Sequence, residues 1–351
     1  MEFRVLHVVR ACISQPVECA SQAQARGRRW REVMTASLLT FSMLLSLGGC
    51  SSGTTGSSST DTASSSTTDA NASPSGAGAE PVQVVAIENF WGSIATQVGG
   101  ERVKVTSIIT NPNTDPHDYE PKPTDARLIA SARYVILNGA GYDPWGQKLL
   151  DANPVDGRKV LTVGELVGKR EGDNPHLWYN PSYVMRVVDQ VTADLKSLAP
   201  ADAAYFDQQR TQLMTVGLKS YKDTISTIKQ KYQGTAVGAT ENIFAYLTAP
   251  LGLKLIAPPK FMTAISEGDE PTVADKATFD KQVTQKQIKV LVYNRQNSTP
   301  DTEALQKKAQ TAGIPIVPIT ETLEPATATF QDWQTGQLKA LQQALAKSTG
   351  R

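Results

Sequence analysis

The sequence predicts an α/β protein with two lobes, each built on a parallel sheet, joined by one long rigid helix. Runs rich in β-branched residues, such as 82–87 ("VQVVAI") and 103–109 ("VKVTSII"), alternate with segments of helical spacing. This alternation is typical of a parallel sheet covered by helices. It stops after residue 195 and restarts at 234–240 ("GTAVGAT"). The restart predicts a second lobe with a sheet of its own.

The joining helix is predicted from the stretch between the two alternating regions. Residues 201–231 contain no glycine or proline except Gly217. At 1.5 Å per residue, a helix of this length extends roughly 45 Å, which is too long for a crossover inside a small domain. We therefore divide the body into an N-terminal lobe (82–195), a connecting helix (196–232) and a C-terminal lobe (233–351), with a ligand cleft between the lobes.

The elements of the N-terminal lobe follow from hydrophobic period and from start and stop signals. Glycines close one helical segment, and a proline opens the next. The predicted strands are 82–87, 103–109, 134–139 and 158–163. The predicted helices are 89–100, 123–132 and 182–198.

The C-terminal lobe repeats this alternation, with no detectable sequence similarity to the first lobe. Its last segment, 330–347, has the spacing of an amphipathic helix. The predicted strands are 234–240, 253–258, 288–294 and 314–320. The predicted helices are 242–249, 272–286, 301–312 and 330–347.

The N-terminal region has the features of an export signal followed by a tether. Four arginines between 26 and 31 precede an uncharged apolar run, and residues 1–49 end in "LGG" before Cys50. A basic segment before a short apolar run is typical of a signal peptide, and the run is too short for a membrane span. "LGGC" resembles a bacterial lipobox, which implies cleavage before Cys50 and lipidation of its thiol. The alternative is an isolated cysteine after an ordinary signal peptide.

Residues 50–81 are predicted to be a disordered tether because Ser, Thr, Gly and Ala dominate them. A random coil of this length spans roughly 30 Å, which suits a link between a membrane anchor and a globular body. We therefore expect an exported protein, anchored by lipid to the outer face of the cell membrane or to the periplasmic side.

Charge and cysteine content exclude several classes of function. The chain has 35 Lys and Arg against 34 Asp and Glu, and removal of 1–49 leaves 29 against 31. This balance indicates no nucleic-acid partner. The cysteines are Cys12, Cys19 and Cys50, so the body predicted to remain after cleavage has no disulfide and no thiolate site.

Four metal-ligand side chains fall at predicted strand ends or in the loops beyond them: His117, His176, Glu241 and Glu321. Ligands of open α/β sheets bind outside the carboxyl ends of the strands, so two facing lobes would bring these groups to one cleft. Alternatives for the last carboxylate are Glu324, Asp269 and Glu270. Glu120 is a candidate to orient an imidazole, or else it faces solvent. We expect three tryptophans, Trp91, Trp145 and Trp178, to lie in the core or to line the cleft. We expect Asn294 and Arg295 to bound the site.

Two imidazoles and two carboxylates suit one divalent transition-metal ion. Imidazole binds Zn, Fe and Mn, and carboxylates favour the harder ions. Two carboxylates would also neutralise a doubly charged ion, which lowers the cost of burying it. The absence of a thiolate argues against Cu(I). We expect Zn or Mn, with Fe as a further possibility, and a metal affinity that falls in acid because only neutral imidazole coordinates.

Three segments resemble the solute-binding proteins of zinc/manganese ABC transporters, the cluster A-I family. They are "DPHDYEPKPTDARLIASARYVILNGAGYDPW", "DNPHLWYNPSYV" and "TENIFAYLTAPLGLKLI". The resemblance extends over the whole body from about Val82. It implies two α/β lobes joined by a rigid helix, with a metal held between them by three histidines and an aspartate, or by two histidines, a glutamate and an aspartate.

The resemblance assigns the ligands by motif position. His117 and His176 match the first two ligands, and Glu241 matches the third, where manganese-type members carry glutamate. The fourth position departs from the family, because "ITETLEP" stands where a motif like "YTDSLG" is common. Glu321 is our assignment there. The histidine-rich loop of some zinc members is absent.

We expect a receptor without enzymatic activity, which captures one metal ion as cargo and delivers it to the permease of an ABC importer. It is expected to act as a monomer. The rival class is a metal-dependent hydrolase, but four protein ligands leave little room for the catalytic water, and the sequence has no HExxH or nucleophile-elbow motif. An adhesin or a metallochaperone could use the same site.

Overall fold

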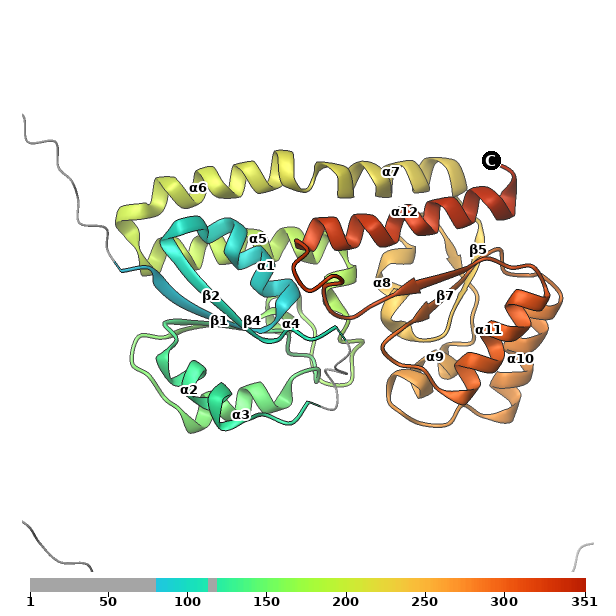
Figure 1. Ribbon diagram of the computed structural model, residues 1–351, viewed down its shortest axis with the longest axis horizontal. Coiled ribbons are helices and arrows are strands. Elements are labelled where there is room, and N and C mark those ends of the chain that lie inside the picture. The colour runs from blue at the N-terminus through green and yellow to red at the C-terminus, as the bar shows by residue number, and fades with distance from the viewer. Residues whose placement is uncertain (1–79, 113–118) are drawn as a thin grey trace, which may run out of the picture. The chain divides into compact units, whose positions relative to one another are not determined.

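Two four-stranded parallel sheets form the centres of two lobes in this computed structural model, which describes residues 80–112 and 119–351 (Figure 1). The first sheet has the order β2-β1-β3-β4 and the second the order β6-β5-β7-β8. The strands are Val82–Glu88 (β1), Val103–Ile109 (β2), Tyr134–Leu137 (β3), Lys159–Thr162 (β4), Ala236–Ala239 (β5), Lys254–Leu255 (β6), Leu291–Asn294 (β7) and Ile316–Ile319 (β8). The predicted fold class is therefore confirmed. The predicted signal peptide, Cys50, the tether up to residue 79 and His117 lie outside the described residues.

The central strand β1 shows why these apolar runs form a parallel sheet. Its last five residues are buried, because helices cover both faces of the sheet. Val84 and Ala86 face one cluster with Phe90, whereas Val85 and Ile87 face a separate cluster with Trp145. Successive side chains thus enter opposite cores, as the two-residue period of a strand requires.

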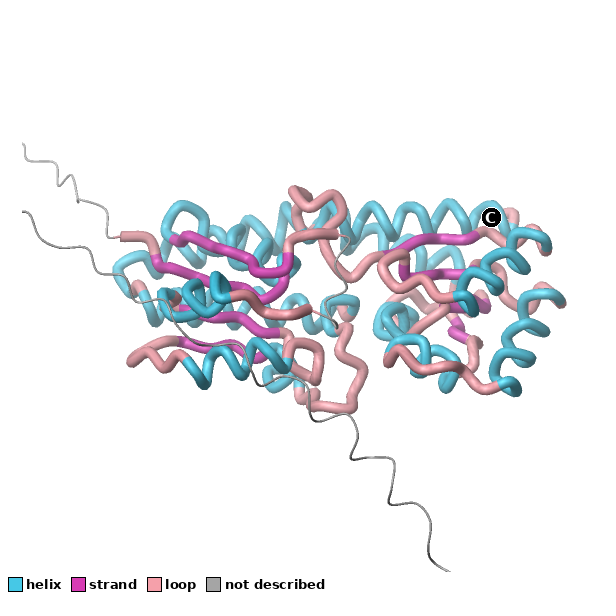
Figure 2. Tube along the Cα trace, turned by 60° about the horizontal axis from the view of Figure 1, so that its bottom comes forward, coloured by secondary structure: helices cyan, strands magenta, loops and turns pink. Residues whose placement is uncertain are grey.

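Helices flank both sheets (Figure 2). In the first lobe they are Asn89–Gly99 (α1), Pro123–Ser131 (α2), Pro144–Ala152 (α3), Val163–Val167 (α4) and Pro181–Leu198 (α5). In the second they are Ala245–Thr248 (α8), Pro259–Ser266 (α9), Val273–Thr284 (α10), Pro300–Thr311 (α11) and Phe330–Thr349 (α12). The sequence did not predict α3, α4 or α9, which are short. Within the described ranges, no helix has both the length and the apolar composition that a membrane crossing requires.

The connecting helix is built from two α-helices. The chain turns at a 3-10 segment, Pro200–Asp202, and continues as Ala203–Gln212 (α6) and Lys219–Tyr232 (α7), with a π-helical turn at Leu213–Gly217 between them. Gly217 lies in this turn, close to α12. A Cβ added at Gly217 would lie 3.6 Å from Gln331 Nε2 of that helix. In Figure 1, α6 runs along the first lobe beside α5, and α7 runs along α12 of the second.

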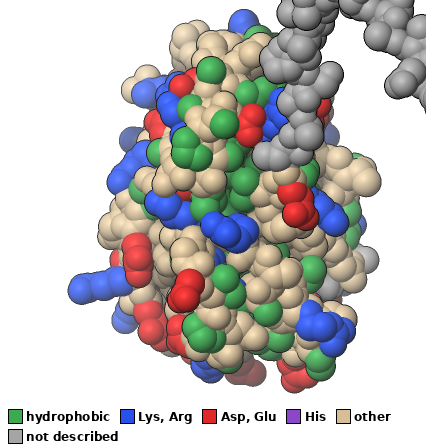
Figure 3. All heavy atoms as spheres, turned by 90° about the vertical axis from the view of Figure 1, so that its left-hand side faces the viewer, with side chains coloured by type: hydrophobic (Ala, Val, Ile, Leu, Met, Phe, Trp, Pro, Cys, Tyr) green, Lys and Arg blue, Asp and Glu red, His purple; other side chains and the backbone are tan. Residues whose placement is uncertain are grey.

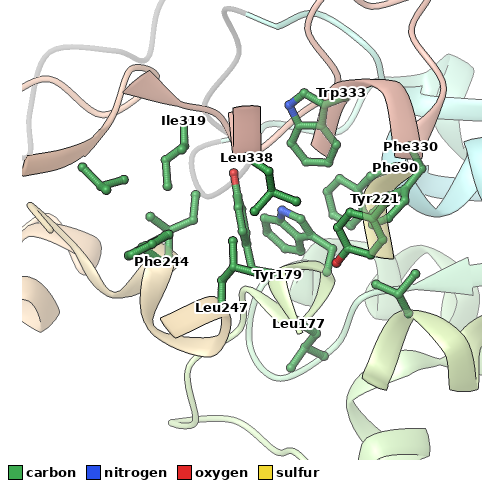
Figure 4. Packing of buried hydrophobic residues seen from close by; sticks show 14 of the residues in the cluster. Phe90, Leu177, Tyr179, Tyr221, Phe244, Leu247, Ile319, Phe330, Trp333 and Leu338 are labelled. Atoms are coloured by element: carbon green, nitrogen blue, oxygen red, sulfur yellow. The ribbon is translucent and has the colours of Figure 1, made fainter. Parts of the chain in front are cut away.

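The two lobes share one hydrophobic core. Phe90 of α1 stacks on Trp178 with 4.1 Å between ring centroids. Phe90 also lies 6.4 Å from Trp333 of α12 between ring centroids (Figure 4). Tyr221 of α7 packs edge-on against Phe330 in the same cluster. Burial of Trp91, Trp145 and Trp178 confirms their expected place in the core or cleft.

Charged side chains of both signs are interspersed on the face seen in Figure 3. Several of the acidic and basic side chains in the described residues are paired, for example Lys159 with Asp194 and Arg102 with Asp202. This face carries no continuous basic stripe of the kind that nucleic-acid binding requires.

Candidate metal centre

His176, Glu241 and Glu321 form a buried cluster between the lobes. Each offers a ligand atom, and the three atoms lie within 4.8 Å of one another. His176 Nε2 is 3.9 Å from Glu321 Oε2, and all three side chains are at most 1% exposed. Among the described residues, this is the one group of three or more His, Cys, Asp or Glu side chains with such spacing. The remaining predicted ligand, His117, is not among the described residues.

Each of the three side chains comes from a strand end or a loop beyond a strand, as the sequence predicted. Glu241 is the second residue after β5, and Glu321 is the second after β8. Both strands are parallel, so their carboxyl ends meet at one edge of the second sheet. His176 comes from the loop between α4 and α5 of the first lobe and directly precedes the 3-10 turn Leu177–Tyr179.

Both oxygens of the Glu321 carboxylate accept hydrogen bonds, one from each lobe. Tyr142 Oη donates to Oε2 over 2.7 Å, and Asn294 Nδ2 donates to Oε1 over 2.6 Å. The Glu321 main-chain N–H donates to Gln296 Oε1 over 2.6 Å. Side chain and main chain are therefore both fixed. Asn294 bounds the site as predicted, whereas Tyr142 was missed, although it lies in one of the segments that carry the family resemblance.

The rival carboxylates lie elsewhere. Glu324 pairs with Arg295, with 2.7 Å between Oε1 and Nη1. Asp269 and Glu270 are exposed, and so is Glu120. None of these four belongs to the buried cluster.

The Glu241 side chain contacts α9, an element that the sequence did not predict. Ser266 Oγ lies 3.4 Å from Glu241 Oε2 and donates to Asn242 Oδ1 over 2.9 Å. It also accepts a hydrogen bond from the Asn242 main-chain N–H over 3.2 Å. The last residue of α9 thus fixes the chain next to the Glu241 carboxylate.

The His176 ring is enclosed by aromatic side chains. Trp178 lies 5.3 Å away and Tyr142 6.2 Å away between ring centroids, both edge-on. His176 Nδ1 is 2.8 Å from Asn174 Oδ1. A ligand histidine commonly donates its second ring N–H to such an oxygen, which orients the ring.

A second acidic pair lies beneath the turn that carries Tyr142. Burial raises the pKa of Glu88 well above its ordinary value, and the neighbouring Asp143 carboxylate raises this pKa further. Burial also raises the pKa of Asp143, but hydrogen bonds from the main chain oppose the shift. Asp143 accepts the N–H groups of Asn138 and Gly139 over 2.8 and 2.7 Å. Burial next to Asp143 therefore favours the protonated form of Glu88, while Asp143 holds the turn.

The donor set of the cluster is suited to binding a divalent cation. An imidazole nitrogen and two carboxylates, with a further imidazole available from the chain, are ligands of Zn, Mn and Fe. The carboxylates supply the two negative charges that a buried divalent ion needs.

Comparison with known proteins gives a consistent match. The family model described as "Zinc-uptake complex component A periplasmic" matches residues 84–344. The manganese-binding lipoprotein MntA of Halalkalibacterium halodurans is 26% identical over 50% of this chain and 60% of its own length. The zinc-binding lipoprotein AdcA of Streptococcus pneumoniae is 25% identical over 70% of this chain and 52% of its own. The chain thus spans only about half to three fifths of these relatives.

A solved structure shows the same fold. A Mn-bound point mutant of a periplasmic metal-binding protein from Candidatus Liberibacter asiaticus superposes with a TM-score of 0.65 at 17% identity. The superposition covers 75% of this chain and 99% of that one.

Proposed function

Since the chain belongs to the zinc-uptake complex component A family, we propose that it is an extracytoplasmic receptor that binds one divalent transition-metal ion and delivers it to an ABC importer. The observation that carries the proposal is the buried cluster of His176, Glu241 and Glu321. Its ligands come from both lobes, so an ion at this place would be enclosed between them. His117 is proposed as the remaining ligand, beside these three.

Zn or Mn is the proposed cargo, with Fe as a further possibility. The names of the relatives support this range, because MntA is a manganese-binding and AdcA a zinc-binding lipoprotein. Two carboxylates favour Mn, but two imidazoles and two carboxylates can also hold Zn in a tetrahedral site. Zinc stands high in the intrinsic affinity order, so tight zinc binding in vitro would not by itself identify the physiological metal.

The permease of the importer is the proposed partner, and lipid on Cys50 the proposed anchor. The lipoprotein names of MntA and AdcA support the anchor. The receptor is proposed to act as a monomer and to carry out no chemistry on the ion. Four protein ligands would occupy a tetrahedral ion completely, whereas a hydrolytic zinc site keeps one position for water.

Metal content measured by mass spectrometry tests the proposal. The protein is equilibrated with Mn, Fe and Zn together, desalted and compared with His176→Ala. We expect about one ion per chain in the wild type and none in the variant, because the imidazole is a ligand. The matched control is Arg295→Ala, a surface residue beside the site, which should retain the ion. Absence of a stoichiometric ion, or an unchanged His176→Ala variant, would contradict the proposal.

A further inference from the structure

Asn174 lies where the lobes meet, two residues before His176, and its side-chain amide contacts both lobes. Oδ1 accepts the His176 main-chain N–H over 3.1 Å and lies 2.8 Å from His176 Nδ1. Nδ2 donates to the main-chain oxygen of Asn242 over 2.7 Å. Asn242 directly follows Glu241 in the second lobe. The main-chain oxygen of Asn174 accepts a hydrogen bond from Tyr246 Oη over 2.9 Å.

The main-chain partners determine the orientation of the Asn174 amide. A main-chain N–H can only donate, and a main-chain carbonyl can only accept. The amide oxygen must therefore face His176 and the amide nitrogen must face Asn242. This orientation follows without any assumption about the imidazole.

The oriented amide then selects the tautomer of His176. Because Nδ1 faces an oxygen that can only accept, Nδ1 carries the hydrogen in the neutral ring. The lone pair is then on Nε2, the nitrogen that lies 3.9 Å from Glu321 Oε2 in the buried cluster. The other tautomer would place the Nδ1 lone pair against the Asn174 oxygen.

We propose that Asn174 is a positioning residue for metal binding, which sets the tautomer of His176 and ties it to the Glu241 strand end. The tie runs from His176 through the Asn174 amide to the Asn242 carbonyl. Ser266 holds the other side of Asn242 and contacts Glu241. Two proposed ligands from different lobes thus keep a fixed separation. This inference rests on the proposed metal site, but the tautomer can be measured without metal.

Two substitutions separate the effect of Asn174 on the His176 tautomer from its hydrogen bond to the second lobe. Asn174→Ala removes both the acceptor for Nδ1–H and the donor to Asn242. Asn174→Asp keeps an acceptor for Nδ1–H but has no donor for the Asn242 carbonyl. Asn153→Ala is the matched control, because the Asn153 amide donates to the Leu149 main-chain oxygen, away from the cluster.

The test is nitrogen NMR of the metal-free full chain with ¹⁵N-labelled histidine at pH 8. The chain has three histidines, and His7→Ala and His117→Ala assign their signals. We expect the Nδ1–H tautomer at His176 in the wild type, in Asn174→Asp and in Asn153→Ala, and a mixture with the Nε2–H tautomer in Asn174→Ala. Zinc affinity, measured with a competing chelator, should fall about 10- to 100-fold in Asn174→Ala and stay unchanged in Asn153→Ala.

A purely structural role for Asn174 would leave the tautomer unchanged. Retention of wild-type ¹⁵N shifts and zinc affinity in Asn174→Ala, or an Nε2–H tautomer in the wild type, would overturn the inference. Should Asn174→Ala fail to fold, Asn174→Asp still decides, because loss of the Nδ1–H tautomer there contradicts the inference. Failure of the wild type to bind zinc would reject the proposed function, whereas the tautomer populations would still decide the role of Asn174.

Discussion

At the scale of single residues, the site depends on polar groups buried with defined partners. Glu321 accepts hydrogen bonds from Tyr142 and Asn294, which lie in different lobes. Glu88 and Asp143 lie together beneath the turn that carries Tyr142. A buried polar group without a hydrogen-bond partner lowers the unfolding free energy. These hydrogen-bonded groups therefore hold the local geometry in which their partners are met. Because burial raises the pKa of Glu88 in the folded protein, the unfolding free energy depends on whether Glu88 is protonated.

Replacement of Glu88 by glutamine should stabilise the protein increasingly as pH rises. The pKa of Glu88 is raised in the folded protein, so its contribution is fully present below the unfolded value near 4.5 and is lost as pH rises toward the folded pKa. Glutamine cannot ionise. The difference in unfolding free energy between Glu88→Gln and the wild type should therefore grow by up to about 1.4 kcal/mol per pH unit in that window.

Urea unfolding at several pH values measures this difference. Glu101→Gln is the control, because the Glu101 side chain is 74% exposed and its variant should follow the wild-type pH dependence. A Glu88→Gln curve parallel to that of the wild type would show that Glu88 ionises equally in both states.

At the scale of elements, the strands that carry the ligands are constrained by their packing. In β5, a Cβ built on Gly238 would lie 2.9 Å from both Ile288 Cδ1 and Phe279 Cε2. Phe279 belongs to α10 and is fully buried. A glycine at this place lets the helix approach the strand that leads to Glu241.

Two Gly→Ala substitutions should therefore have opposite effects on stability. Gly238→Ala should lower the unfolding free energy by about 1–3 kcal/mol through overpacking. Gly336 lies in α12, and among the described residues no atom beyond its own stretch of helix would lie within 4 Å of an added Cβ. Gly336→Ala should therefore raise the unfolding free energy by about 0.8–1 kcal/mol through helix propensity. Chemical denaturation of both variants checks this. A neutral or stabilising Gly238→Ala would mean that α10 moves aside without cost.

Elements with a clear hydrophobic period or an apolar run could be predicted from the sequence, whereas three short helices and the π-helical turn could not. The helix of α12 follows from its own spacing, and the strand ends followed by Glu241 and Glu321 follow from two short apolar runs. The π-helical turn at Leu213–Gly217 leaves no such pattern. α9 is short, yet it supplies Ser266. The bond between Tyr142 and Glu321 joins residues 179 positions apart, so only tertiary structure creates it.

At the scale of the whole described body, one face of α1 fastens the first lobe to the second. Asn89 Oδ1 accepts the Leu323 N–H over 3.2 Å, and Ser93 Oγ accepts the Phe330 N–H over 2.9 Å. The amides of Gln97 and Gln331 pair reciprocally. Asn89, Ser93 and Gln97 are four residues apart and so lie on one face of the helix. The contacted segment begins just after Glu321, so this face supports the loop that carries this proposed ligand.

Binding of one metal ion between the lobes is best checked by a crystal structure of the zinc-loaded protein. Anomalous diffraction at the zinc edge locates the ion independently of the protein atoms. We predict one strong peak per chain, about 2.0–2.2 Å from ligand atoms of His176, Glu241 and Glu321 and from His117. A peak outside this cluster, or an ion bound without His176, would show that the metal site is not the one proposed.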